Sequence, residues 1–267
     1  MKLAVLAVAA AVAASPAATG ARFLESHELA SGGFAEAGGG AYPQLSAWAV
    51  LGLRAAGRGA GEPTNRYLAG HERELTSATD IALVAMAERD PSALLARLRA
   101  LQRPNGSIGG LVNGTAWGVL ALRAAGKPVP AKTVRWLISR QRPAGGWGWN
   151  GAPDSNDTAA VVEALRAAGV RGRPIRRALA FLLRYRNRDG GFELTRGRGS
   201  DAQSTAWVVQ AFVAAGKPPP RGSLAYLRAL RRPDGSFRYS RRYVTTPVWV
   251  TAQVLPALAR KPFPLRR

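Results

Sequence analysis

Two aspartates in the middle of the chain, Asp154 and Asp157, have the residue type and spacing of a small acid–base site. A carboxyl group with a raised pKa can donate a proton in catalysis, whereas the amide of the intervening Asn156 cannot. Aspartate at a helix start also accepts unpaired backbone N–H groups, and Asp80 and Asp201 occupy similar places before other apolar runs. We therefore interpret Asp154 and Asp157 first as helix caps and second as candidate catalytic residues.

Three tryptophans form a second candidate site, because each stands two residues after a Ser or Thr that recurs along the chain. Trp48, Trp117 and Trp207 could offer aromatic faces to a cation or a flat apolar surface to an apolar ligand. Core packing is the favoured alternative, because a structural role recurs in every repeat, whereas a binding site need not. We keep the three as candidate substrate-binding residues.

These residues belong to a sequence repeat that occurs about six times along the chain. The first half of each repeat obeys a spacing rule. An aromatic or long residue is followed five positions later by Gln or a charged residue. Gly comes four positions after that, and an aromatic two positions later. Four copies obey every offset: Phe23/Glu28/Gly32/Phe34, Trp136/Gln141/Gly145/Trp147, Phe181/Arg186/Gly190/Phe192 and Tyr226/Arg231/Gly235/Phe237. Self-similarity at this period indicates a repeat architecture, although the second unit lacks the Gly-x-aromatic turn.

The second half of each unit predicts a buried helix. The units align on Ser46, Thr79, Thr115, Thr158, Thr205 and Thr251, and inner helices are expected to start near these residues. The runs that follow are apolar on nearly every side, whereas the first halves carry Arg between their apolar positions. A helix that is apolar all round is buried, and one with a polar stripe lies on the surface. We therefore predict an all-α fold, a closed (α/α)6 toroid of about twelve helices.

Three segments are predicted along the chain. Residues 1–20 have a lysine, an apolar run and small residues, the order of a cleaved secretory signal peptide, with a buried N-terminal helix as the alternative. Residues 21–260 are predicted to form a single toroid domain. Residues 261–267 are predicted to be a basic C-terminal tail. The expected location is therefore secreted or extracytoplasmic.

Composition narrows the chemistry. The chain has no cysteine, so a disulfide, a thiolate zinc site and a cysteine nucleophile are excluded, and we expect neither a metal nor a cofactor. Its formal charge is +22, and all but five of the 38 basic residues are arginine. This charge could attract an anionic cell-envelope surface, although a general bias towards Arg explains it better. The arginines are scattered through every repeat, so nucleic acid is not expected as a partner.

The chain resembles the terpenoid cyclase and protein prenyltransferase α/α-toroid superfamily from about Phe23 to Leu258. Gln141, Gly145 and Trp147 match the QW repeat of squalene cyclases, in which this segment ends an outer helix and turns into an inner one. Residues 154–159 resemble the Asp-x-Asp-Asp-Thr-Ala stretch of class II cyclases. The third position of that stretch is the general acid that protonates the isoprenoid, and here it is Asn156.

Two functions remain open. The absence of that acid and the presence of one barrel instead of two favour a secreted, non-catalytic toroid. Such a protein would bind an apolar or amphipathic, isoprenoid-like ligand or an envelope partner. The alternative is a divergent class II terpenoid cyclase, an intramolecular transferase in which Asp154 and Asp157 remain from the acidic motif.

The ring itself predicts a ligand site. We expect all inner helices to run in one direction, so that their partly positive N-termini converge at one mouth above an apolar wall. That mouth should carry Asp80, Asp154, Asp157 and Asp201. An amphipathic ligand would fit with its polar head at the mouth. The alternative is a ring centre filled by Trp48, Trp117, Trp207 and Trp249.

Overall fold

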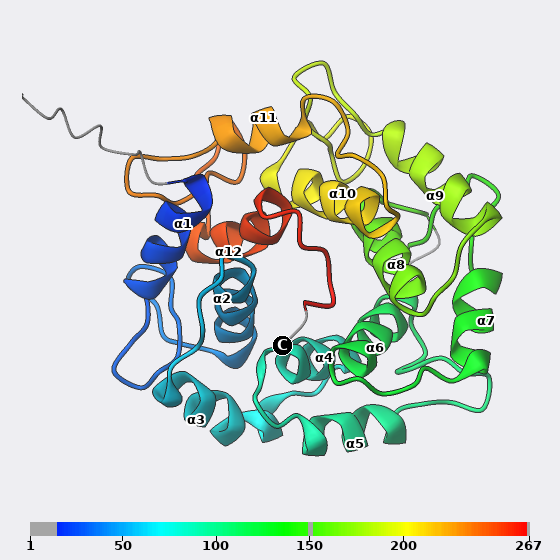
Figure 1. The fold of residues 1–267 in the computed structure, drawn as a ribbon, viewed down its shortest axis with the longest axis horizontal. Helices are drawn as coiled ribbons and strands as arrows, with labels where there is room; N and C mark the ends of the chain where they lie inside the picture. The colour runs from blue at the N-terminus through cyan, green and yellow to red at the C-terminus, as the bar shows by residue number, and fades with distance from the viewer. Residues whose placement is uncertain (1–14, 149–151, 266–267) are drawn as a thin grey trace, which may run out of the picture.

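The computed structural model describes residues 15–148 and 152–265, which fold into two concentric rings of helices (Figure 1). The outer ring consists of α1 (Pro16–Glu25), α3 (Glu62–Gly70), α5 (Ser92–Ala100), α7 (Ala131–Ser139), α9 (Arg173–Leu183) and α11 (Ser223–Ala229). The inner ring consists of α2 (Pro43–Ala55), α4 (Ala78–Ala87), α6 (Val112–Ala124), α8 (Ser155–Ala167), α10 (Ala202–Ala214) and α12 (Pro247–Leu258). A short 3-10 helix, Glu72–Glu74, follows α3. The predicted all-α toroid of twelve helices is confirmed.

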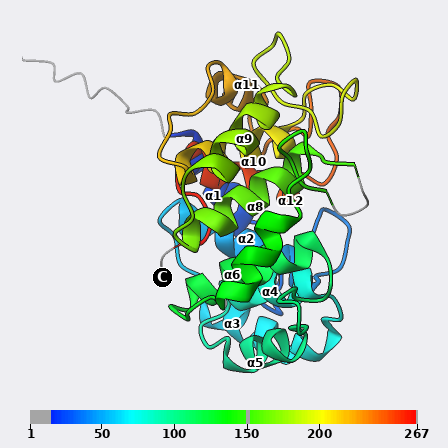
Figure 2. The same cartoon turned by 90° about the vertical axis from the view of Figure 1, so that its right-hand side faces the viewer.

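The division into rings follows from how apolar residues are spaced. Ten of the thirteen residues of α8 are buried, because the helix is covered on all sides. In α9 only Ile175, Ala178, Phe181 and Leu182 are buried, at the spacing of one helix face. That face packs on α8, and Figure 2 shows α9 lying over it in the side view. Among the described residues, no helix is long and apolar enough to cross a membrane.

A single hydrogen bond explains why the two halves of each unit keep their spacing. The hydroxyl group of the aligned Ser or Thr accepts the buried backbone N–H of the residue two positions after the turn glycine. The bonds are Phe34 to Ser46, Ile108 to Thr115, Trp147 to Thr158 and Phe192 to Thr205, each 2.9 Å, and Phe237 to Thr251, 3.0 Å. The inner helix therefore holds the end of the turn that precedes it.

The turn also contacts the next unit, which fixes the distance between repeats. Gly145 has a φ of +103°, and a Cβ atom at that position would lie 2.7 Å from the carbonyl oxygen of Arg177 in α9. Only glycine allows both this backbone conformation and this approach. The side-chain amide of Gln141 donates to the carbonyl oxygens of Gly145, at 2.8 Å, and of Pro174, at 2.9 Å.

The ring closes because the last unit makes these contacts with the first. Inner helix α12 packs against α2. The carboxylate of Glu36, which precedes α2, accepts the backbone N–H groups of Val248 and Trp249 at the start of α12, at 3.0 and 2.9 Å. A Cβ atom at Gly235, in the last turn, would lie 2.6 Å from the carbonyl oxygen of Thr19 in α1. An open solenoid is therefore excluded.

The second unit differs from the others, as its sequence suggests. The chain passes from α3 through the 3-10 helix to Leu75, which is buried, and α4 begins three residues later. Without a Gly-x-aromatic turn, the hydroxyl group of Thr79 has no turn N–H to accept. It donates instead to the side-chain oxygen of Asn113 at the start of α6, at 2.8 Å.

The N-terminal boundary of the folded domain lies upstream of the predicted one. Ser15 caps α1, which begins at Pro16, and Gly20 and Ala21 are already buried. Cleavage after Gly20 would remove the first half of α1. Residues 1–14, which carry the apolar run of the predicted signal peptide, lie outside the described residues, so export stays a prediction.

The C-terminal segment was predicted to be a separate basic tail, and this prediction is wrong for its described residues. They are part of the ring. After α12 the chain turns into the centre of the toroid (Figure 1), where Phe263 is 2% exposed and Leu265 6% exposed. The two apolar side chains explain this course, because burial removes them from water. The domain therefore extends to Leu265 within the described residues.

We expect Thr158→Val to destabilise the protein by about 1–3 kcal/mol, because the buried N–H of Trp147 loses its acceptor while the side-chain shape is kept. Urea unfolding followed by circular dichroism would measure this free energy. Thr158→Ser, which retains the hydroxyl group, is the control and should be closer to wild type. Equal stability of Thr158→Val and wild type would mean that this bond does not hold the turn.

Candidate functional site

The N-termini of the inner helices meet at one end of the ring, as predicted, and polar side chains connect them there. The side chain of Asn113 at the start of α6 accepts from Thr79 on α4 and donates to Asp157 on α8, at 2.8 and 2.7 Å. Further round the ring, the contact is between backbone groups: the N–H of Ala202 at the start of α10 donates to the carbonyl oxygen of Tyr239, at 2.7 Å. The acidic motif therefore lies in a hydrogen-bonded rim.

Asp154 and Asp157 lie together at the start of α8. Asp154 is the N-cap residue, and its carboxylate accepts the backbone N–H of Asp157 at 2.8 Å. Asp157 is 7% exposed, and Asn156 between them is part-exposed. The capping interpretation is confirmed for Asp154 but not for Asp157, which lies in the first turn of α8 and accepts from the side chain of Asn113. The structure also brings the two carboxyl groups side by side.

Burial changes the chemistry of this cap. Desolvation, together with the negative charge of Asp157, raises the pKa of Asp154 to about 7 against the lowering effect of backbone N–H donors. Burial thus favours the protonated form of the Asp154 carboxyl group over the ionised form. A part-exposed carboxyl group that keeps its proton near neutrality can serve as a general acid.

The other two predicted aspartates differ from one another. Asp201 caps α10 in the way that Asp154 caps α8, accepting the backbone N–H of Ser204 at 2.7 Å, and burial raises its pKa to about 6. Asp80 lies in the first turn of α4, where Ser77 is the cap. Among the described residues, aspartate thus caps two inner helices, part-exposed at Asp154 and buried at Asp201.

A polar cavity beside Asp201 was missed from the sequence. It has a volume of about 460 Å³ and is lined by Arg198, Arg241, Arg242, Tyr226 and Tyr239 among others. The Tyr226 hydroxyl group donates to the carbonyl oxygen of Ser200 at 2.7 Å, and burial raises its pKa. The only signal in the sequence is the cluster of Arg and Tyr between residues 238 and 243, which resembles the basic surface elsewhere.

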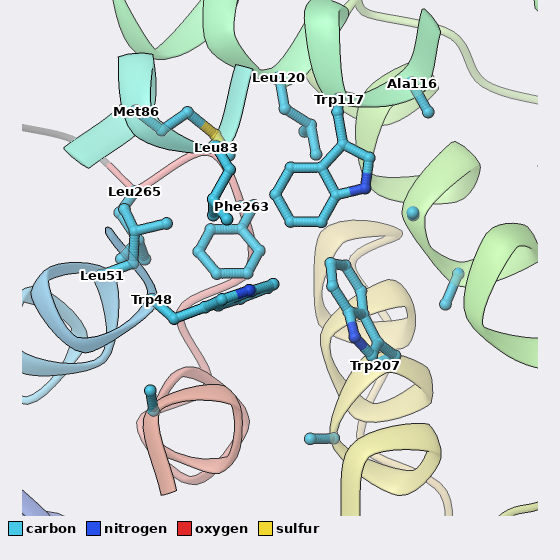
Figure 3. Close-up of a cluster of buried hydrophobic side chains, with 14 of the residues drawn as sticks. Trp48, Leu51, Leu83, Met86, Ala116, Trp117, Leu120, Trp207, Phe263 and Leu265 are labelled. Carbon is cyan, nitrogen blue, oxygen red and sulfur yellow. The ribbon is translucent and has the colours of Figure 1, made fainter. Parts of the chain in front are cut away.

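The candidate substrate-binding tryptophans meet at the ring axis rather than around an open cavity (Figure 3). The ring centroids are 5.4 Å apart for Trp48 and Trp117, 6.0 Å for Trp48 and Trp207, and 5.5 Å for Trp117 and Trp207. Their planes are steeply inclined, as favourable edge contacts require. The side chain of Phe263 completes the cluster, whereas Trp249, which was expected to help fill the centre, is part-exposed on α12.

No protein-family model matches the chain, but two curated relatives match part of it. The drimenyl diphosphate synthase of Streptantibioticus cattleyicolor is 38% identical over 141 residues, 49% of this chain and 26% of that protein. The drimenyl diphosphate synthase of Streptomyces showdoensis is 31% identical over 166 residues, 53% of this chain and 30% of that protein. The chain thus spans less than a third of the length of these relatives.

Solved structures share the whole toroid. The type II terpene cyclase MstE from Scytonema, in its apo form, superposes with a TM-score of 0.66 at 14% identity, over 91% of this chain and 96% of its own. The ent-copalyl diphosphate synthase from Streptomyces platensis has a TM-score of 0.55 at 20% identity, over 82% of this chain and 50% of its own. A glycosidase in complex with glucose also superposes, with a TM-score of 0.61 at 13% identity, over 92% of this chain and 96% of its own.

Fold and sequence similarity together place the chain in the terpenoid cyclase-like α/α-toroid superfamily. MstE is matched over 96% of its own chain, so the two chains share this single toroid. Nothing in these matches supports export or an envelope partner, which stay predictions.

We expect the Asp154 carboxyl carbon, followed by NMR in protein with labelled aspartate, to titrate with a midpoint at about 7. Because folding raises this pKa, the stability linked to the protonated group is greatest at low pH and falls as the pH rises through about 7. Asp157→Asn should lower the midpoint by removing the adjacent charge, whereas Asp80→Asn on α4 should leave it unchanged. A wild-type midpoint at the ordinary value of 3.8 would contradict the assignment.

Proposed function

We propose that this protein is a class II-type terpene cyclase in which Asp154 donates the initiating proton. The observation that carries the proposal is the pair of carboxyl groups at the start of α8, one of which keeps a pKa of about 7. The sequence similarity to two drimenyl diphosphate synthases supports the same class. This favours the alternative drawn from the sequence over the non-catalytic binding protein.

The reaction would be an isomerisation that needs no change in redox state. The O–H bond of Asp154 breaks as its proton forms a C–H bond with a terminal double bond of the isoprenoid, which leaves a carbocation. Neighbouring double bonds close rings onto that cation, and loss of a proton from carbon restores neutrality. Asp157 supports the acid, because its negative charge keeps the proton on Asp154 at neutral pH.

The departure at Asn156 changes which residue is the acid but not the kind of chemistry. An amide side chain has no acidic proton to give. Asn156 lies beside Asp154 and Asp157 in the first turn of α8, where its side-chain oxygen accepts from Ser155 at 3.2 Å. The proton therefore comes from the cap position, two residues earlier than in the motif that the stretch resembles.

The arginine-lined cavity suits the other end of such a substrate. Arg198, Arg241 and Arg242 present guanidinium groups, which bind the oxygens of a diphosphate well. The segment from Glu193 to Asp201 connects the cavity to α8, because Ser155 donates to the carbonyl oxygen of Glu193 at 2.9 Å. A prenylated aromatic acid is a second substrate class, since MstE is described with geranylgeranyl dihydroxybenzoate.

Binding without catalysis is the second candidate, favoured by the filled ring centre. Trp48, Trp117, Trp207 and Phe263 occupy the axis, where an isoprenoid chain would otherwise extend. A protein of this kind would hold an isoprenoid-like ligand at the mouth alone. Export and an envelope partner belong to this candidate and rest on the sequence only.

The test is incubation of the purified full chain with farnesyl and geranylgeranyl diphosphate, followed by phosphatase treatment and gas chromatography with mass spectrometry of the released alcohols. We expect a cyclic product, and Asp154→Asn should reduce its formation by at least about 100-fold, the usual effect of losing a general acid. Asp80→Asn, in the first turn of a different inner helix, is the matched control. Binding of either diphosphate without product would establish the second candidate.

A further inference from the structure

The far end of the ring holds a site that the proposed reaction does not use. There the inner helices end, and a cavity of about 540 Å³ is lined by Arg54, Glu163, Arg166 and the segment from Arg260 to Leu265. The C-terminal segment enters this mouth and reaches the axis of the toroid (Figure 1). One wall of the site is therefore made by the chain's own end.

Phe263 sits in a box of tryptophans. Its ring centroid lies 6.0 Å from that of Trp48, 6.3 Å from Trp117 and 5.9 Å from Trp207 (Figure 3). Three indole rings around one centre can hold a phenyl ring, and they also stabilise a positive charge against their faces. The box is built from α2, α6 and α10, so it is a property of the ring rather than of the segment.

A buried carboxyl group faces the same segment. Glu163 is fully buried, and its Oε2 accepts the backbone N–H of Phe263 at 2.6 Å. Its Oε1 has no hydrogen-bond partner among the described residues. Burial raises the pKa of Glu163 well above its ordinary value. A carboxyl group with half of its acceptors unused is costly in this position, so packing alone does not explain it.

The register of the repeats places this group in the lumen. Glu163 stands five residues after the aligned Thr158, as Leu51 and Leu120 do after theirs, and those leucines point into the cluster in Figure 3. Gln210 holds the equivalent position on the adjacent α10, and its Oε1 also lacks a partner among the described residues. Two buried acceptors on neighbouring helices are thus unfilled.

The contacts of Phe263 indicate the chemistry of a better ligand. Its backbone nitrogen, Cα, Cβ and ring form a phenylethylamine skeleton, but an amide nitrogen donates only one hydrogen bond. A primary ammonium group donates three. It would donate to Glu163 Oε2 as the amide does and has further donors for Glu163 Oε1, while its charge would favour the ionised form of this buried carboxyl group.

Charges of both signs meet at this mouth, because Arg54, Arg166, Arg260 and Lys261 line the cavity together with Glu163 and the ends of inner helices. The C-terminus of each inner helix carries about half a negative charge, and six of them converge here. Arg54 is held by the carbonyl oxygens of Met86 and Ala87 at the end of α4, at 2.7 and 3.0 Å. Arg166 likewise donates to Ala214 at the end of α10, at 3.0 Å. Each of these two arginines thus caps the end of a neighbouring inner helix.

We propose that the lumen formed by Trp48, Trp117, Trp207, Glu163 and Gln210 is a binding site for a primary arylalkyl amine, and that Pro262–Leu265 occupies it as an intramolecular ligand. The segment competes with the amine. The apparent affinity of the intact protein for the amine is therefore the affinity of the open site multiplied by the fraction of molecules in which the segment has withdrawn. The cavity opens at the opposite end of the ring from Asp154, and its tryptophans also bound the lumen that an isoprenoid chain would enter. Binding of the amine does not itself depend on the proposed cyclisation.

The test compares three probes that share one ring and differ in charge: 2-phenylethylamine, 2-phenylethanol and phenylacetate. Binding is measured by calorimetry and by tryptophan fluorescence on full-length wild type and Phe263→Ala. We expect the variant to bind the amine at least about tenfold more tightly than wild type does, because competition is removed. It should also prefer the amine over the alcohol and the acid by at least about tenfold, as expected for a paired ammonium group.

Phe263→Ala combined with Glu163→Gln is the discriminating control, because Gln keeps the shape but loses the charge. The double variant should lose the preference for the amine while still binding the alcohol. Equal binding of all three probes by Phe263→Ala would show a simple apolar void, of the kind that any deleted phenyl ring leaves, and would overturn the proposal. If Phe263→Ala does not fold, Leu265→Ser loosens the same segment and leaves the box intact, and the same preference is expected.

Discussion

A buried hydroxyl group on five of the six inner helices holds the turn that precedes it, and the toroid depends on this contact. In the fourth unit Thr158 accepts the N–H of Trp147, while Gly145 lies against the next outer helix. One bond thus joins a turn to its own inner helix, and one close approach joins it to the neighbouring unit. Because both recur at nearly constant geometry, each unit is rotated by a similar amount and the sixth meets the first.

The closed ring makes the two ends of the molecule chemically different. Parallel inner helices gather their partly positive N-termini at one mouth and their partly negative C-termini at the other. Asp154 and Asp201 cap helices at the first mouth and are buried deeply enough for their pKa values to rise to about 7 and 6. At the second mouth, Glu163 meets the chain's own end.

Membership of the terpenoid cyclase-like superfamily explains the architecture but leaves the chemistry to particular side chains. The same toroid occurs in type II cyclases and in a glycosidase, so the ring is a scaffold for more than one reaction. Asn156 moves the candidate acid by two residues, and the tryptophan cluster with Phe263 shortens the lumen that an isoprenoid could enter. Both features separate this chain from a simple copy of the family pattern.

The repeat spacing by itself determined the fold, because the offset from turn glycine to inner-helix hydroxyl is a local constraint that every unit repeats. It also located Asp154 and Asp157, since helix caps are set by neighbouring residues. What only the tertiary structure decided depends on contacts between distant units. The raised pKa of Asp154 needs burial by the rim, and the arginine cavity needs two loops. The basic residues around Phe263 predicted a separate tail, but Phe263 is buried among the tryptophans. The sequence could not show this, because the apolar lumen exists only when the ring has closed.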